Sequence, residues 1–163
     1  MNIDGQTTGK QPSNETRPTK ETEPRAAMAH RGSCHCGAVR FEVDLEAGAG
    51  GTRCNCTICT KTAQVGAITK PEAFRLLSGE ASLGAYEWGS KMSRRYFCNR
   101  CGIHVFGRGH LDVLGGDFVS INLNALDDID VGQLAITFWD GRHDNWRAGT
   151  RPMPWPVVAP PSS

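Results

Sequence analysis

The chain has 163 residues, with 18 Lys and Arg residues against 17 Asp and Glu residues. That length is enough for one domain with a modest core, and a net charge near zero gives no general attraction for nucleic acid or an anionic membrane. No uncharged apolar stretch approaches the roughly 20 residues of a membrane span, and none near the start resembles the apolar part of a signal peptide. We therefore expect a soluble, cytoplasmic protein with no membrane or nucleic-acid partner.

The first 27 residues are poor in apolar side chains and rich in Thr, Lys, Glu, Pro, Gln and Asn. Such a segment buries too little apolar surface to offset the entropy that is lost on ordering. We expect a disordered tail at 1–27 and one folded domain at 28–163.

Short strands dominate the expected secondary structure. Residues 38–45 and 117–124 alternate apolar and polar side chains with a period of two, which is typical of half-buried strands. Further short or extended strands are expected at 65–69, 83–88, 91–97, 103–106 and 134–139. Because no segment has a strong helical pattern, the sequence predicts a single, small, mainly β domain whose core is reinforced by metal.

Glycine and proline indicate the connections between these strands. Residues 47–52 hold three glycines and residues 107–116 are irregular, so both segments are expected to be loops. Residues 71–77 predict one turn of helix that leads into an extended piece. The prolines beyond residue 151 exclude a regular helix or a central strand, so the C-terminus is expected to be an extended surface segment anchored by Trp155.

Seven cysteines occur in three tight groups along the chain. The groups are Cys34 and Cys36, then Cys54, Cys56 and Cys59, then Cys98 and Cys101. Buried structural cysteines scatter along a chain, whereas metal ligands come in local groups that form a chelating turn. Seven thiols also cannot all pair as disulfides within one chain. This pattern predicts zinc bound by thiolates.

The number of thiols suggests two kinds of zinc site. A structural zinc has four protein ligands, whereas a catalytic zinc has three and keeps one position open. The two outer pairs then form a four-thiolate site and the central group a three-thiolate site. The spacing also allows a division in which Cys34, Cys36, Cys54 and Cys56 share one ion. Zinc held by three thiolates is thiophilic, so a thiol is the substrate that the open site suits.

Three cysteine motifs and one late polar motif carry a family resemblance. They occupy residues 32–41 (GSCHCGAVRF), 54–61 (CNCTICTK), 97–106 (FCNRCGIHVF) and 140–146 (DGRHDNW). In order and separation they resemble the glutathione-dependent formaldehyde-activating enzyme (GFA) family, which also includes the centromere protein V group. The resemblance implies a fold similar to the Mss4-like fold, two zincs per chain, and carbon–sulfur lyase activity in which glutathione adds reversibly to formaldehyde.

The resemblance also implies a role for each cysteine. The structural set would be Cys34, Cys36, Cys98 and Cys101. The catalytic set would be Cys54, Cys56 and Cys59, whose zinc takes the glutathione sulfur at its open position. The expected partners are a small thiol and a small aldehyde, and the oligomeric state is left open.

Charged residues near the cysteines are candidates for binding or proton transfer. Arg53 and Lys61 flank the central group and are expected either to contact a glutathione carboxylate or to be solvated loop charges. His104 follows the last cysteine by three residues and is the first choice for a general acid or base, whereas His35 is expected to point to solvent. The polar segment 142–146 either lines the substrate pocket or forms a turn that packs a tryptophan.

An alternative function is a zinc-stabilised binding module, for chromatin or a protein partner, without turnover. The chain has no basic run, but four arginines are candidates for an assembled patch: Arg94, Arg95, Arg100 and Arg108. Salt-dependent DNA binding would favour this interpretation, and thiol-dependent aldehyde consumption would favour the enzyme.

Overall fold

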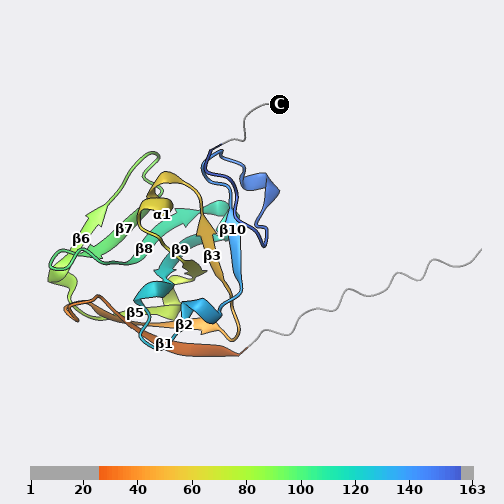
Figure 1. Cartoon of the computed structure of the whole chain (residues 1–163). Coiled ribbons are helices and arrows are strands. Elements are labelled where there is room, and N and C mark those ends of the chain that lie inside the picture. Colours follow the sequence, from red (N-terminus) through yellow and green to blue (C-terminus); the bar gives the residue numbers. More distant parts are fainter. Residues whose placement is uncertain (1–25, 159–163) are drawn as a thin grey trace, which may run out of the picture.

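Two sheets form the domain in the computed structural model, which describes residues 26–158 (Figure 1). The smaller sheet is antiparallel and has the order β1-β2-β5, formed by β1 (Ala27–Ser33), β2 (Arg40–Glu46) and β5 (Phe74–Ser78). The larger sheet has the order β10-β3-β4-β9-β8-β7-β6. Its strands are β3 (Gly51–Cys54), β4 (Gly66–Thr69), β6 (Leu83–Tyr86), β7 (Ser93–Cys98), β8 (His104–Leu111), β9 (Gly116–Asn122) and β10 (Ile136–Trp139). β10 is parallel to β3, and the other neighbours are antiparallel.

Helices are few and short. Between residues 26 and 158 the single α-helix is α1 (Thr57–Lys61). Six 3-10 turns accompany it, at Pro71–Ala73, Glu80–Ser82, Asp112–Leu114, Leu123–Ala125, Val131–Gln133 and Trp146–Ala148. No helix in this part of the chain is both long enough and apolar enough to cross a membrane. The predicted mainly β domain is thus confirmed.

The core lies between the two sheets. β2 alternates as predicted, with Phe41 buried in the core and Arg40 exposed. The ring of Phe106 from the larger sheet lies 6.0 Å from that of Phe41 and 4.6 Å from that of Phe74, while Tyr96 stacks on its other side at 5.0 Å. Aromatic rings at these separations add attraction beyond the burial of their area. This aromatic cluster joins the two sheets.

The predicted loop at 107–116 is wrong over its first half, because β8 continues to Leu111. Glycines suggested a loop, but here they allow close packing between strands. A Cβ atom on Gly107 would lie 2.6 Å from Ser120 Oγ, and one on Gly109 would lie 2.6 Å from the Phe118 ring. Glycine in a strand often marks such a close approach.

Most other expected elements are present, with a few additions. The segment 71–77 forms a helical turn followed by β5, as predicted, and Trp155 anchors the C-terminal segment through a 3.0 Å hydrogen bond from its Nε1 to the Phe138 carbonyl. β1, β3 and α1 are additional to the prediction. The expected disordered tail falls outside the described residues except at its end, where Ala27 begins β1.

Candidate functional site

Four cysteine sulfur atoms meet where the two sheets approach each other, and we call them the four-cysteine cluster. Cys34 and Cys36 lie in the turn between β1 and β2, and Cys98 and Cys101 lie at the turn between β7 and β8. The four Sγ atoms all lie within 4.8 Å of one another. The Sγ separations are 3.6 Å from Cys34 to Cys36 and 3.7 Å from Cys36 to Cys98. The cluster therefore links a turn of the small sheet to a turn of the large one.

Both turns have the same local design. Gly37 and Gly102 have φ values of +71° and +76°, in the left-handed region that favours glycine. Their backbone N–H groups donate to the carbonyls of Cys34 and Cys98, at 2.9 and 2.8 Å. Each turn thereby brings its two cysteines to one side, as a metal-binding knuckle requires.

Backbone donors around this cluster favour the thiolate form that a metal needs. The N–H of Val39 donates to Cys34 Sγ at 3.3 Å. Backbone N–H groups of Ile103 and Cys36 lower the pKa of Cys101 to about 6. These backbone donors favour the thiolate at Cys34 and Cys101, whereas at Cys36 the hydrogen bond from the Ala38 N–H is outweighed by hydrogen bonding with Cys34, which raises the pKa of Cys36 to about 11.

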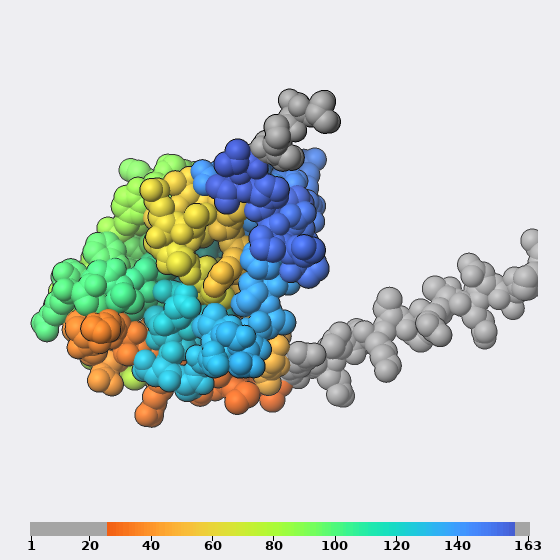
Figure 2. Space-filling model, viewed as in Figure 1, coloured from red at the N-terminus to blue at the C-terminus, as the bar shows by residue number. Residues whose placement is uncertain are grey.

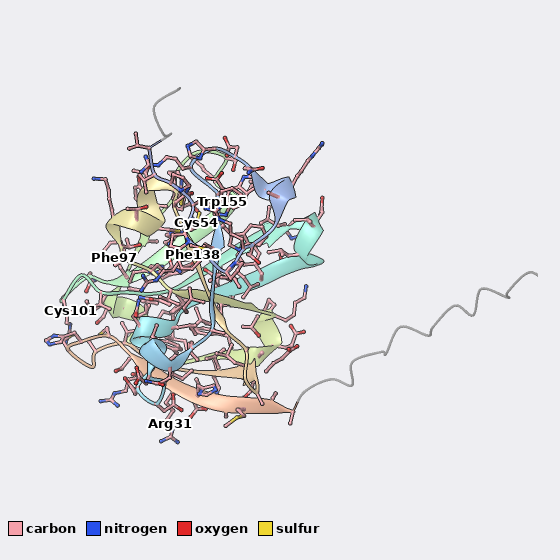
Figure 3. All side chains as sticks on the ribbon, turned by 45° about the vertical axis from the view of Figure 1, so that its right-hand side comes forward. Arg31, Cys54, Phe97, Cys101, Phe138 and Trp155 are labelled. Atoms are coloured by element: carbon pink, nitrogen blue, oxygen red, sulfur yellow. The ribbon has the colours of Figure 1, made fainter. Side chains whose placement is uncertain are left out.

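The remaining three cysteines form a second group, the three-cysteine cluster. Cys54 ends β3, Cys56 caps the start of α1 and Cys59 lies within α1, and their Sγ atoms lie within 4.8 Å of one another. Hydrogen bonds from Cys54 and Cys59 lower the pKa of Cys56. Figure 3 shows Cys54 beside Phe138 and Trp155, well away from Cys101. All seven thiols are free.

A cavity of about 130 Å³ opens beside the three-cysteine cluster. Its wall consists of Thr52, Cys54, Cys59, Gln64, Gly66, Ala67, Ile68, Arg95 and Ser120. The space-filling view has a hollow between the yellow surface of α1 and the gold surface of β3 (Figure 2). Two cysteine sulfurs therefore border a space that a small ligand can enter. The four-cysteine cluster is not part of this wall.

Arg95 is the cation that reaches the cysteines. Its Nη2 donates to Cys59 Sγ at 3.2 Å, and its Nη1 donates to Gln64 Oε1. Its guanidinium carbon lies 5.1 Å from the centre of the Trp88 ring. Gln64 is itself fixed, because its backbone N–H donates to the Cys59 carbonyl at 3.2 Å. The positive charge is thus held at one wall of the cavity.

Asn55, between two of the cysteines, ties the C-terminal segment to the cluster. Its buried Nδ2 donates to Asp140 Oδ1 at 2.7 Å and to the Pro156 carbonyl at 3.2 Å. Its Oδ1 accepts from the backbone N–H of Arg142 at 2.8 Å. Substitution of a buried amide with all these bonds destabilises the fold, because each partner left behind loses its hydrogen bond.

Asp140 is the centre of a small polar network. Only 4% of its surface is exposed. Burial opposes its ionisation, but hydrogen bonds from Asn55, His143 and Asn145 lower the pKa of Asp140 below its ordinary value. The His143 Nδ1 lies 2.7 Å from Asp140 Oδ1. This contact orients the imidazole, and 44% of the His143 side chain is exposed.

Gly141 brings the C-terminal segment against the cysteines. A Cβ atom there would lie 2.5 Å from Cys54 Sγ and 2.7 Å from the Trp146 ring. Trp146 in turn contacts Trp139, with ring centres 6.0 Å apart. The segment 142–146 therefore forms a turn whose tryptophan contacts Trp139 but stays half-exposed, and the Arg142 N–H bonds to Asn55 in the cysteine loop. None of its residues lines the cavity.

The charged residues and histidines that the sequence singled out differ in their exposure to solvent. Arg53 and Lys61 are exposed, and neither side chain makes a hydrogen bond or ion pair with residues 26–158. His35 points to solvent, as predicted. His104 is half-buried, but both of its ring nitrogens are buried, and neither has a hydrogen-bond partner among residues 26–158. Burial and the nearby charge of Arg95 lower the pKa of His104 to about 4.

Of the arginines considered for a basic patch, Arg94 and Arg108 are register partners on one face of the sheet, and Arg95 faces the other way. Arg95 turns toward Cys59, whereas Arg108 lies over the ring of Phe74, 5.3 Å from its centre, on the core side of the sheet. Arg94 is paired with Glu87 at 2.7 Å. A patch of all four arginines, which the sequence left conceivable, is therefore not formed, because Arg95 turns to the cysteines.

Comparison with known proteins assigns the chain to a family. A family model described as "Glutathione-dependent formaldehyde-activating enzyme" matches residues 29–140, a range that contains all seven cysteines. The chain belongs to the GFA family. The fold is accordingly the Mss4-like fold that this family shares, as the sequence predicted.

Individual GFA relatives are distant. A Penicillium rubens protein named "Putative glutathione-dependent formaldehyde-activating enzyme" is 30% identical over 98 residues, which are 56% of this chain and 51% of that protein. The chain thus matches about half the length of this relative. A crystal structure of a Rhodobacter sphaeroides protein is similar with a TM-score of 0.57 and 27% identity, over 66% of this chain and 99% of the other.

Several residues around the GFA cysteines were not identified from the sequence. Arg95 lies 36 residues from Cys59 and reaches it only through the strand order. Asn55 and Asp140 are 85 residues apart. The one available signal was the late motif at 140–146, whose first two residues, Asp140 and Gly141, both contact the cysteine loop.

Proposed function

We propose that the chain is a zinc-dependent carbon–sulfur lyase that adds a glutathione-like thiol reversibly to formaldehyde. A sulfur–carbon bond forms, the carbonyl π bond breaks, and the thiol proton passes to the oxygen, giving an S-hydroxymethyl thioether. Membership of the GFA family supports this reaction class. The observation that carries the proposal is that three cysteine sulfurs, and not four, form one cluster, and that two of these cysteines line an open cavity.

The two clusters fit zinc by the chemistry of their donors. Sulfur donors select soft or borderline metals, and sets of four and three thiolates match structural and catalytic zinc sites. We assign the structural zinc to Cys34, Cys36, Cys98 and Cys101 and the catalytic zinc to Cys54, Cys56 and Cys59. Free thiols that stay reduced suit a cytoplasmic location, which we also propose.

The walls of the cavity suggest how the substrates bind. Zinc at the three-cysteine cluster would supply a thiophilic Lewis acid that favours the thiolate form of the substrate. The Ser120 hydroxyl faces the cavity and makes no side-chain hydrogen bond with residues 26–158, so it is available to the aldehyde oxygen. Arg53 and Lys61, exposed beside the cluster, stay proposed contacts for a glutathione carboxylate.

Two histidines are candidates for moving the proton. His104, predicted from the sequence, is neutral at pH 7 because its pKa is about 4, but both of its ring nitrogens are buried. His143 is exposed, and Asp140 holds its Nδ1, which leaves Nε2 for proton exchange. We keep His104 as the proposed general acid or base, with His143 as the second candidate.

The reaction can be tested by exchange NMR, because thiols add to formaldehyde unaided and the catalysed rate must exceed that background. We expect the protein to accelerate exchange of ¹³C-formaldehyde between its hydrate and the glutathione adduct, and the Cys56→Ala variant to return the rate to background. Equal exchange rates with and without the wild-type protein would exclude the lyase. The binding module would then be favoured if the protein bound DNA in a salt-dependent way.

A further inference from the structure

We infer that Arg95 is a positioning residue that allows the three-cysteine cluster to accept a fourth, anionic sulfur. The inference rests on the proposed function and adds a residue that sets its thiol affinity. It also says which part of the substrate Arg95 stabilises. Arg95 offsets the charge of the substrate sulfur and does not bind a carboxylate elsewhere in the thiol.

Three contacts from three directions fix the Arg95 side chain. Nη2 donates to Cys59 Sγ at 3.2 Å, Nη1 donates to Gln64 Oε1, and the guanidinium plane lies by the Trp88 ring at 5.1 Å. Gln64 is only 8% exposed, so its amide is a rigid acceptor. A guanidinium held in this way loses little further freedom when a ligand arrives.

The charge of the cluster explains why a cation is needed there. A divalent zinc held by three thiolates would carry a net charge of −1, and an incoming thiolate would change this to −2. Like charges repel strongly where little water remains to screen them. Arg95 contributes +1 in direct contact with Cys59 Sγ, so it offsets the added charge where it accumulates. It also withdraws electron density from that sulfur through a charge-assisted hydrogen bond.

No other cation of the described chain, residues 26–158, makes a hydrogen bond to a cysteine sulfur. Arg53 and Lys61 are exposed and make no such bond. The Arg142 Nη1 donates to Thr57 Oγ1 at 3.3 Å. The compensation of charge at the sulfur therefore depends on Arg95.

The chain offers a matched control in the preceding residue of β7. Arg94 has the same side chain on the same strand, but it is half-exposed and pairs with Glu87 at 2.7 Å. Its register partner is Arg108, away from the cavity. An Arg94→Gln variant thus removes one positive charge from the same strand without touching the cysteines.

The test measures thiol binding directly, without turnover. Cobalt is loaded in place of zinc, its amount per chain is determined, and the sulfur-to-cobalt charge-transfer band is titrated with two thiols: uncharged 2-mercaptoethanol and the carboxylate-bearing 3-mercaptopropionate. We expect Arg95→Gln to weaken both thiols alike, by roughly 10- to 100-fold, as for loss of a hydrogen bond to a charged group. Arg95→Lys should restore part of the affinity, and Arg94→Gln should leave it unchanged. The cobalt content should be the same in all variants.

Three results would overturn the inference while leaving the lyase intact. Unchanged thiol affinity in Arg95→Gln would show that the charge is not needed. A loss confined to 3-mercaptopropionate would make Arg95 a carboxylate anchor. Loss of one cobalt per chain would make it a support for the metal alone. If wild-type protein responded to neither thiol, the proposed function would fail, and the inference with it.

Discussion

His104 is the residue with the least compensated polar group in the part of the chain that the structure describes. Both its ring nitrogens are buried without a hydrogen-bond partner. Burial of an unpaired polar group costs free energy, and protonation would add the larger cost of burying a charge beside Arg95. The imidazole therefore stays neutral well below its ordinary pKa.

This burial predicts a specific pH dependence of stability. Between the unfolded-state pKa of 6.5 and about pH 4 the unfolded chain binds a proton at His104 that the folded chain does not bind, so the free energy of unfolding decreases as the pH is lowered through that window. His104 contributes on the order of 2 kcal/mol to the loss of unfolding free energy between pH 7.5 and pH 5. A His104→Phe variant should lose that much less stability over this range, measured by urea unfolding at both pH values with equal zinc. The same pH dependence in both proteins would mean that the ring is reached by solvent.

At the residue scale, the cysteine clusters could be predicted because their members lie close together in the sequence. Cys54, Cys56 and Cys59 occupy six residues, so no knowledge of the fold was needed to group them. Arg95 could not be predicted, because a strand places alternate side chains on opposite faces and only the register shows which of Arg94 and Arg95 faces the cavity.

Among the elements, the C-terminal segment after β10 determines how the three-cysteine cluster is shaped. Gly141 brings it against Cys54 Sγ, and Asn55 bonds to it through Asp140 and Pro156. Figure 1 shows this blue segment beside β3 and β10. The segment is thus a support for the cysteine loop, although it supplies no sulfur.

A Gly141→Ala variant should show this dependence. The added Cβ would come within 2.5 Å of Cys54 Sγ, so the sulfur or the segment has to shift. We expect zinc affinity at the three-cysteine cluster to fall by about tenfold or more, since overpacking typically costs 1–3 kcal/mol, with four-cysteine binding retained. Competition with a chromophoric chelator measures both affinities. An unchanged zinc affinity at the three-cysteine cluster would contradict the close packing of Gly141 against Cys54.

The sequence was less informative about elements than about ligands. Period-two alternation identified β2 and β9, whose inward side chains fill the core. α1 has five residues, too few for a helical period to be recognised, and β8 contains two glycines that resemble a loop. In both places tertiary packing, and not local preference, determines the structure.

For the whole molecule, the two cysteine clusters occupy separate places, and we propose separate tasks for them on that ground. The four-cysteine cluster joins turns from the two sheets across some 60 residues of chain, so a metal bound there would hold the sheets together. The three-cysteine cluster lies within one edge of the larger sheet, at β3 and α1, beside the cavity. Replacing a cysteine of the four-cysteine cluster should therefore impair folding. Replacing a cysteine of the three-cysteine cluster should instead impair the reaction and leave the fold intact.

Zinc content and folding, measured together in two matched cysteine variants, test this division most directly. Wild type should hold about two zincs per chain. Cys56→Ala should hold about one and keep its near-ultraviolet circular dichroism and cooperative unfolding. Cys98→Ala should lose cooperative unfolding, because structural zinc binding is also folding free energy, of the order of 10 kcal/mol. If Cys56→Ala unfolded, or if Cys98→Ala remained as stable as wild type, the assignment of the two clusters would be wrong.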